Sequence, residues 1–200
     1  IKADILACTV RNIATARAGL QAALADFVSV NLRETAGALQ MEGQAFDRLP
    51  NELSRRLLIA ALRWIAGASH PPRETQLDQL RARLAARQEA TLGGVRFLWR
   101  ADMLTIAREL RAAQGAVDPA LLWDGRWRLE GPAHRGTLRA LGLDGLALCP
   151  DRPRDIPRAA LVVSPSLWAD GTLIAAPLAG FGPDFTAKLS QGFTEFILSH

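Results

Sequence analysis

The sequence predicts an α+β protein, with a mainly helical first domain that carries a β-hairpin and a small α+β second domain. Three observations support this prediction. Apolar residues recur every three and four residues through much of the first half of the chain, which is the period of an amphipathic helix. A stretch near residue 100 alternates in the manner of a hairpin. Beyond residue 120, short apolar runs are separated by Asp-Gly pairs, which are turn signals.

The first element is predicted to be a helix from about residue 3 to residue 27. Ile13, Leu20, Leu24 and Phe27 recur on one of its faces, as in an amphipathic helix. Residues 28–41 then alternate apolar and polar side chains about a glycine, which predicts a short hairpin.

A stronger helix is predicted in FDRLPNELSRRLLIAALRWIAG, residues 46–67. Pro50 suits the first helical turn, Glu52 complements the positive end of the helix dipole, and Gly67 suits the C-terminal cap. Apolar side chains cover roughly half of the helix circumference, so we expect the core to surround this helix almost completely.

Arginines occupy the polar surfaces of this helix and of the next one. Arg56 and Arg63 lie about 20° apart around the helix axis, so they point the same way. A third helix is predicted at residues 73–88, where leucines are buried while Arg73 and Arg81 are exposed. Acidic residues on the same surface can neutralise part of this charge.

The hairpin is predicted in TLGGVRFLWRADMLTIARE, residues 91–109. Its period of two places Arg96 and Arg100 on one face and the bulky apolar side chains on the other. The glycine pair at 93–94 is not followed by the Lys-Ser/Thr of a phosphate loop, so we interpret it as a bulge or close-packing point. Arg108 and Glu109 are expected to form an ion pair that ties the hairpin to the domain.

Residues 112–120, AAQGAVDPA, lack both periods and are predicted to form a linker. We therefore divide the chain into a helical domain at residues 1–114 and a small α+β domain at residues 115–200. In the second domain, Asp124-Gly125 and Asp170-Gly171 should join short strands, and LGLDGLALC should pass from a strand into a short helix.

The composition favours some classes of function over others but does not identify one. The net charge is +4, and only two of the 24 basic residues are lysines, so 22 are arginines, whose planar fork suits phosphate. An Ala-, Leu- and Arg-rich composition also follows from a GC-rich coding sequence, so charge alone does not establish nucleic-acid binding. Cys8 and Cys149 have no partner at the spacing of a zinc site or disulfide framework.

The chain has no apolar run long enough to span a bilayer and no signal-peptide pattern, so we expect a cytoplasmic protein without a membrane partner. It begins at Ile1 and enters a helix almost at once, which suggests an excised fragment.

No arrangement of residues predicts catalysis. His70, His134 and His200 lack a nucleophile or carboxylate at a suggestive spacing, and Ser164-Pro-Ser166 lacks the G-x-S-x-G context of a nucleophile elbow. We expect no catalytic residue, metal site or cofactor site in this chain. A binding module is the better interpretation.

The tryptophans are predicted to pack in the core rather than to stack on bases. Trp127 is the tryptophan with the best chance of stacking on a base, because Arg126 and Arg128 flank it.

Three stretches resemble the C-terminal portion of the bacterial tRNA(Ile)-lysidine synthases, in an alphaproteobacterial form. They are residues 46–73, residues 91–109, and IPRAALVVSPSLWADGTLIAAPLAGFG at 156–182. The first two resemble that family's substrate-binding domain and the third its end domain, which would make residues 1–114 the tRNA-binding domain. The three stretches span most of the chain in the family's order.

The resemblance implies a parent ligase that adenylates the wobble cytidine of an isoleucine tRNA with ATP, after which lysine displaces AMP. The family's SGGxDS loop is absent here, so ATP and Mg would bind a missing N-terminal catalytic domain. The implied partners are isoleucine tRNA, gripped at its body and acceptor stem, and that N-terminal domain. The oligomeric state is left open, with a homodimer as one option.

Recognition of duplex RNA relies on phosphates, 2′-hydroxyls and shape, which arginines on rigid elements can contact. The candidate nucleic-acid-binding residues are Arg56, Arg63, Arg73, Arg81, Arg96, Arg100, Arg126, Arg128 and Arg135. The alternative is a protein-interaction or dimerisation domain whose arginines meet an acidic partner. A small independent hydrolase would need a nucleophile and a base that the sequence does not provide.

Overall fold

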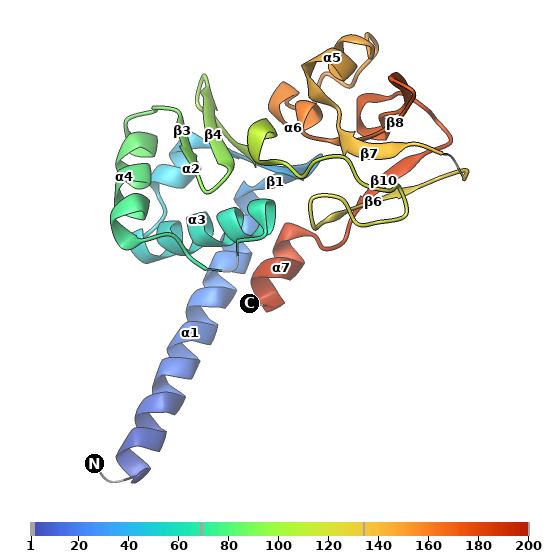
Figure 1. Ribbon diagram of the computed structural model, residues 1–200. Helices are drawn as coiled ribbons and strands as arrows, with labels where there is room; N and C mark the ends of the chain where they lie inside the picture. Colours follow the sequence, from blue (N-terminus) through green and yellow to red (C-terminus); the bar gives the residue numbers. More distant parts are fainter. Residues whose placement is uncertain (1–2, 69, 134, 200) are drawn as a thin grey trace.

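A computed structural model of the chain describes residues 3–68, 70–133 and 135–199 (Figure 1). It has the predicted α+β class. The α-helices are α1 (Ala3–Asn31), α2 (Gly43–Asp47), α3 (Asn51–Ala66), α4 (Glu74–Ala85), α5 (Gly142–Ala147), α6 (Arg158–Val162) and α7 (Phe193–Ser199). The strands are β1 (Arg33–Thr35), β2 (Ala38–Glu42), β3 (Ala90–Leu92), β4 (Val95–Arg100), β5 (Met103–Arg108), β6 (Trp127–Glu130), β7 (Thr137–Ala140), β8 (Pro165–Ala169), β9 (Thr172–Ala175) and β10 (Thr186–Leu189).

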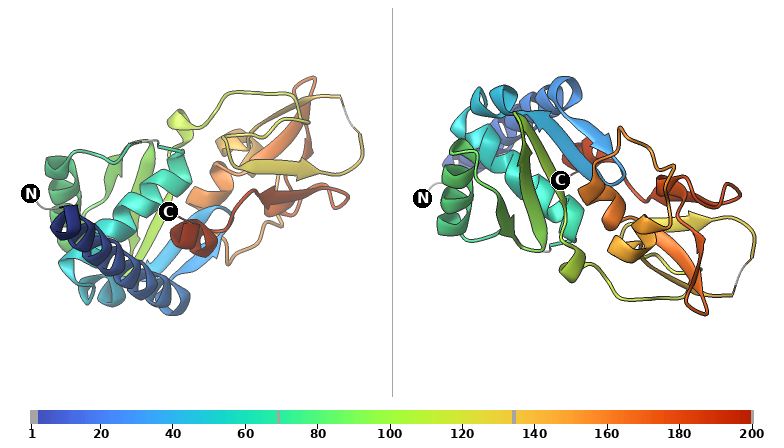
Figure 2. Two further views of the ribbon diagram at one scale, coloured as in Figure 1. Left: turned by 90° about the horizontal axis from the view of Figure 1, so that it is seen from below. Right: turned by 90° about the horizontal axis from the view of Figure 1, so that it is seen from above.

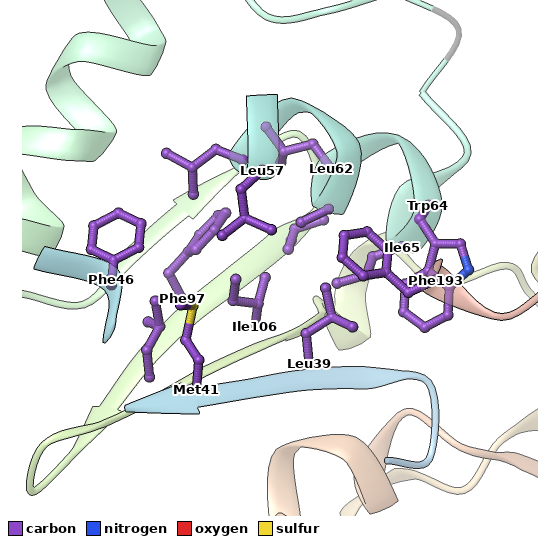
Figure 3. Close-up of a cluster of buried hydrophobic side chains, with 14 of the residues drawn as sticks. Leu39, Met41, Phe46, Leu57, Leu62, Trp64, Ile65, Phe97, Ile106 and Phe193 are labelled. Carbon is purple, nitrogen blue, oxygen red and sulfur yellow. The ribbon is translucent and has the colours of Figure 1, made fainter. Parts of the chain in front are cut away.

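The predicted hairpin of β4 and β5 lies inside a larger antiparallel sheet with the order β1-β2-β5-β4-β3. The first region is therefore less helical than expected. The short hairpin predicted at 28–41 is present as β1 and β2, and β2 pairs with β5. Helix α3 packs on one face of the sheet, where Leu57 and Leu62 meet Leu39, Phe97 and Ile106 (Figure 3).

Helix α3 is the element that the sequence predicted best. Gly67 caps it in the left-handed conformation with φ of 64°, and its N–H donates to the Arg63 carbonyl. Pro50 is its N-terminal capping residue. The buried positions include Leu57, Leu58, Ala61, Leu62, Trp64 and Ile65, as the apolar pattern predicted.

One alternative and one pairing predicted at the hairpin are wrong. The glycines at 93–94 form the turn between β3 and β4 rather than a bulge, with φ of 57° and 75°. The other alternative, close packing, agrees with the structure, because a Cβ at Gly93 would lie 3.7 Å from Leu62 Cδ2 of α3 and one at Gly94 would lie 2.5 Å from Arg108 Nη1. Arg108 pairs with Asp124 instead of Glu109, through Nε and Oδ2 at 3.0 Å. Glu109 follows the last residue of β5 in extended backbone, where adjacent side chains point to opposite sides, so it is a poor partner for Arg108.

Helix α1 is longer than predicted and only its C-terminal part is packed. Leu24 and Val28 are buried in the core, whereas Leu6, Val10 and Ile13 are largely exposed. Figure 1 shows the N-terminal part of the helix extending away from the rest of the chain. The apolar pattern correctly predicts which residues share a face, but most of that face has no covering element among the described residues.

The second region contains a three-stranded sheet, β7-β8-β9, and the separate pair β6 and β10. The predicted Asp-Gly turns at 124–125 and 170–171 are present, with φ of 49° at Asp124 and 47° at Asp170. Helix α5 follows β7 as predicted. Leu141, Leu161 and Trp168 belong to the core that joins this sheet to α5 and α6.

The two regions are in contact at more than one place. Ala160 of α6 packs against Ala107 of β5, on the sheet face opposite to α3 (Figure 2). The C-terminal helix α7 returns to the first region, where Phe193 and Ile197 join its core. The division into domains at residues 114 and 115 stays a prediction.

No helix in the described part of the chain has the length and apolar character needed to cross a membrane. Within the same residues there is no cluster of three or more His, Cys, Asp or Glu side chains that could hold a metal ion. His134 and His200 lie outside the described residues.

Candidate nucleic-acid interface

The main candidate site is an open groove of about 260 Å³ between α1, α3 and α7, which we call the arginine groove. Its floor is apolar and includes Leu24, Ile59 and Ile197. No acidic side chain of the described residues is among those that line it. Four basic side chains line the groove: Arg17, Arg55, Arg56 and Arg63.

Helix α3 brings Arg56 and Arg63 to the groove together, as their spacing predicted. Their charges are not equally available. Arg56 Nε donates to Glu52 Oε1 at 2.7 Å, and Arg55 Nε donates to Glu74 Oε1 at 3.0 Å. The hydrogen bond from Arg55 lowers the pKa of the Glu74 carboxyl below its usual value, because the guanidinium stabilises the ionised carboxylate.

Arg63 is the least neutralised arginine on this helix. It forms no ion pair with any described residue, and its buried Nε has no hydrogen-bond partner in the described part of the chain. Its guanidinium carbon lies 5.8 Å from the ring centre of Phe196 on α7. This aromatic contact supports the side chain without neutralising its charge.

The arginines of α4 differ in exposure. Arg73 is exposed at the N-terminal end of the helix. Arg81 is half-buried, and it donates from Nε to Ser54 Oγ at 3.1 Å and from Nη2 to Asn51 Oδ1 at 2.7 Å. These bonds join α4 to the start of α3, so much of the Arg81 fork is already in use.

Arg96 and Arg100 are exposed on β4, on the sheet face opposite to α3. They are therefore not part of the arginine groove. Arg96 lies 3.9 Å from Glu89, measured from Nη2 to Oε2, and Arg100 has no ion pair with a described residue. The nearby Trp99 is covered by Arg87, whose guanidinium carbon lies 4.4 Å from the ring centre.

Arg87 also binds two carboxylates, one of which, Asp102, lies in the turn between β4 and β5. It contacts Asp47 at 2.7 Å and Asp102 at 3.0 Å, both measured from Nη2 to a carboxylate oxygen. Its hydrogen bond lowers the pKa of the Asp47 carboxyl, because the guanidinium stabilises the ionised carboxylate. Arg87 is accordingly a structural residue.

The expectation that Arg126 lies on the surface is wrong. Its side chain is only 7% exposed and donates from Nη2 to the Gly37 carbonyl at 2.9 Å. Trp127 is buried as well, at 2% exposure, so the exception made for base stacking is also wrong. The expectation of core packing is confirmed for Trp64, Trp123 and Trp168. Arg126 and Trp127 lie in a closed turn before and at the start of β6, in which Trp123 N donates to the Trp127 carbonyl and Trp127 N donates to the Trp123 carbonyl.

Arg128 and Arg135 are exposed in the second region. Arg128 on β6 stands opposite Lys188 on β10, which makes a basic pair across two strands. Lys188 also contacts Glu130 at 2.6 Å, from Nζ to Oε2. Arg135 lines a second hollow of about 500 Å³ beside Phe185.

The structure therefore groups the candidate arginines into separate surfaces. Arg56 and Arg63 share the groove, Arg96 and Arg100 share the outer face of the hairpin, and Arg128 belongs to the second region. Sequence reasoning missed Arg17, Arg55 and Lys188. Arg55 lies beside Arg56 on α3, whereas Arg17 and Lys188 join their surfaces from the distant elements α1 and β10. Such pairings depend on tertiary contacts that no local pattern encodes.

No family model matches the chain, and no solved structure matches it. The chain is 39% identical, over 210 aligned residues, to the tRNA(Ile)-lysidine synthase of Ruegeria pomeroyi. The match covers 100% of the chain and 49% of that protein, so the chain spans about half the length of this curated relative. The similarity, together with the three motifs found in the sequence, shows that the chain belongs to the tRNA(Ile)-lysidine synthase family and represents the C-terminal portion that the motifs predicted.

Proposed function

We propose that this chain is the tRNA-binding part of a tRNA(Ile)-lysidine synthase that works in the cytoplasm. The parent enzyme would adenylate the wobble cytidine of an isoleucine tRNA with ATP and then transfer lysine to it. The similarity to the Ruegeria pomeroyi protein supports this assignment. ATP and Mg would bind the other half of the parent, and this chain would contribute no catalytic residue.

The arginine groove is the observation that carries the tRNA-binding role. It combines a basic rim with rigid helical walls, and Arg63 has no ion pair with a described residue. Phosphate contacts from arginine position an RNA helix without reading its sequence. Arg73, Arg96, Arg100, Arg128 and Arg135 are the exposed arginines that would extend this contact beyond the groove.

The catalytic half of the parent would be the protein partner of this chain. The exposed stripe of Leu6, Val10 and Ile13 on α1 supports such a contact, because an apolar helix face is stabilised when another element covers it.

A salt titration of tRNA binding tests the proposal. We expect the chain to bind an isoleucine tRNA at low salt and to lose affinity steeply as salt rises. The double variant R56M/R63M should reduce the salt slope by roughly 1 to 2, since each phosphate contact contributes about 0.7 to 0.9. The double variant R48M/R83M is the matched control, because Arg48 and Arg83 are exposed outside the candidate surfaces.

Equal loss in both double variants would indicate a general charge effect and would contradict a specific role for the groove. Binding that keeps its strength at high salt would contradict phosphate recognition altogether. Pyrophosphate release from ATP by the chain alone would contradict the placement of catalysis in the other half.

The second candidate function is a protein-interaction or dimerisation domain, and the exposed α1 stripe is the observation that favours it. Light scattering with and without tRNA separates the two functions. A self-assembled species without RNA would support dimerisation, whereas a one-to-one complex that forms only with tRNA would support the first proposal.

A further inference from the structure

Arg126 belongs to the second region, yet its side chain ends inside the first. Its own backbone carbonyl accepts a hydrogen bond from Ser190 N at 2.8 Å, next to the strand pair β6 and β10. Its guanidinium reaches the β1–β2 turn, where Nη2 donates to the Gly37 carbonyl at 2.9 Å. The guanidinium carbon also lies 5.0 Å from the ring centre of Trp64 on α3 and 5.8 Å from that of Trp127.

Other contacts converge on the same place, which we call the joint: Glu34, Gly37, Trp64, Arg126 and Phe193. The Trp64 ring lies 5.3 Å from the ring of Phe193, and its Nε1 donates to the Gln191 carbonyl at 2.9 Å (Figure 3). The Glu34 carboxylate accepts from Phe193 N at 2.7 Å. Each of these contacts links the first region to residues beyond 125, so the joint connects the two regions.

The joint has little free space. A Cβ added at Gly37 would lie 2.5 Å from Trp127 Cζ2 and 3.0 Å from Arg126 Nη2, and Gly37 has a φ of 71°. A small rotation of one region against the other would therefore produce a collision or break the bond to Gly37. The close packing at the joint therefore favours a single orientation of the second region relative to the first.

The arginine at the centre of the joint is a poor choice for stability alone. Its Nε and Nη1 are buried and have no hydrogen-bond partner in the described part of the chain. Burial lowers the pKa of Arg126 to about 10, so the side chain is still a cation at neutral pH. An apolar residue of similar volume would fill the space without this desolvation cost, whereas a planar guanidinium that binds the Gly37 carbonyl and lies over the Trp64 ring fixes an angle.

We propose that Arg126 is a positioning residue that fixes the orientation of the second region, so that both regions can contact one RNA molecule at the same time. The RNA part of this proposal rests on the proposed function. Arg63 and Trp64 are neighbours on α3, and both contact α7, through Phe196 and Phe193. The arginine groove and the joint thus share one rigid support.

Linking two weak contacts raises affinity only when the linkage holds both at the right spacing. The variant R126M should therefore lose affinity for whole isoleucine tRNA by roughly tenfold, as expected when the second contact is no longer aligned. It should bind a minihelix that is shortened until it engages only one region within about twofold of the unsubstituted chain. R126K, which keeps the charge but not the planar fork, should behave like R126M.

The matched control is R128M, on the exposed residue two positions away. A direct phosphate contact at Arg128 would weaken one or both RNAs and lower the salt slope of whole-tRNA binding by about 0.7 to 0.9. Small-angle X-ray scattering gives a readout without RNA. R126M should broaden the distance distribution of the chain, whereas R128M should leave it unchanged.

The outcomes test the positioning role of Arg126 separately from the proposed tRNA-binding function. If the unsubstituted chain fails to bind tRNA, the proposed function is wrong, and scattering alone then tests the orientation. If it binds and R126M has unchanged scattering and unchanged tRNA affinity, the positioning role is overturned. Loss of the cooperative thermal transition in both Arg126 variants would also overturn it, because Arg126 would then be needed for folding itself.

Discussion

At the scale of single residues, burial decides which arginine pairs matter for stability. The pair of Arg108 and Asp124 has side-chain exposures of 10% and 6%, whereas the pair of Arg33 and Asp155 has 61% and 64%. Both pairs have the same N–O distance of 3.0 Å. Water screens the exposed pair, but removing one member of the buried pair leaves an uncompensated charge.

We predict that D124N destabilises the chain by about 3 kcal/mol, because Arg108 loses its buried counter-charge. The position has a φ of 49°, which asparagine tolerates, so backbone strain does not confuse the result. D155N is the matched control and should cost less than about 1 kcal/mol. Urea denaturation measures both values, and equal losses would contradict the role assigned to burial.

The sequence could not supply the partner of Arg108. Asp124 lies beyond the predicted linker, and nothing in the local pattern connects the two positions. Glu109 was the wrong partner because adjacent side chains on extended backbone point to opposite sides, and the backbone is still extended at Glu109, just after β5. Arg126 was predicted to be exposed because it is charged, but its guanidinium is buried in the structure.

At the scale of elements, periodicity predicted where helices and strands form better than it predicted which other elements cover them. The pattern and end signals of α3 fixed its buried face and its C-terminal cap, and alternation fixed the inward face of β4. For α1 the same argument predicted the helix, yet its apolar stripe is buried only near the C-terminal end. A helix period identifies a face but not the element that covers it.

Two substitutions of the same kind test this difference along α1. L24A should destabilise the chain by about 2 to 5 kcal/mol, because Leu24 is 4% exposed and its removal leaves a cavity in the core. I13A should change stability by less than about 0.5 kcal/mol, because Ile13 is 63% exposed. Thermal unfolding followed by circular dichroism measures both. A large loss in I13A would show that this part of the helix is covered in solution.

At the scale of the whole molecule, the C-terminal helix returns to the first helix of the chain. Helix α7 packs beside the C-terminal part of α1 and beside α3 (Figure 2), and Gln21 Nε2 donates to the Ile197 carbonyl at 2.6 Å. The sequence predicted two successive domains and gave no signal for this return, because the apolar residues of α7 fit any nearby core equally well. The return makes the C-terminal helix part of the first core and of the arginine groove.

We predict that this closure makes the first region depend on the last residues of the chain. F193A should destabilise the chain by about 3 to 5 kcal/mol, because Phe193 is 1% exposed and packs against Trp64. F181A is the matched control, since Phe181 is 36% exposed, and it should cost roughly 1 kcal/mol or less. Hydrogen exchange should show the loss of protection from F193A in α3 and in residues 24–31 of α1, which lie more than 120 residues earlier in the chain. If protection falls only around residues 186–199, α7 is an independent appendage, and the arginine groove lacks the fixed wall that the proposed tRNA binding requires.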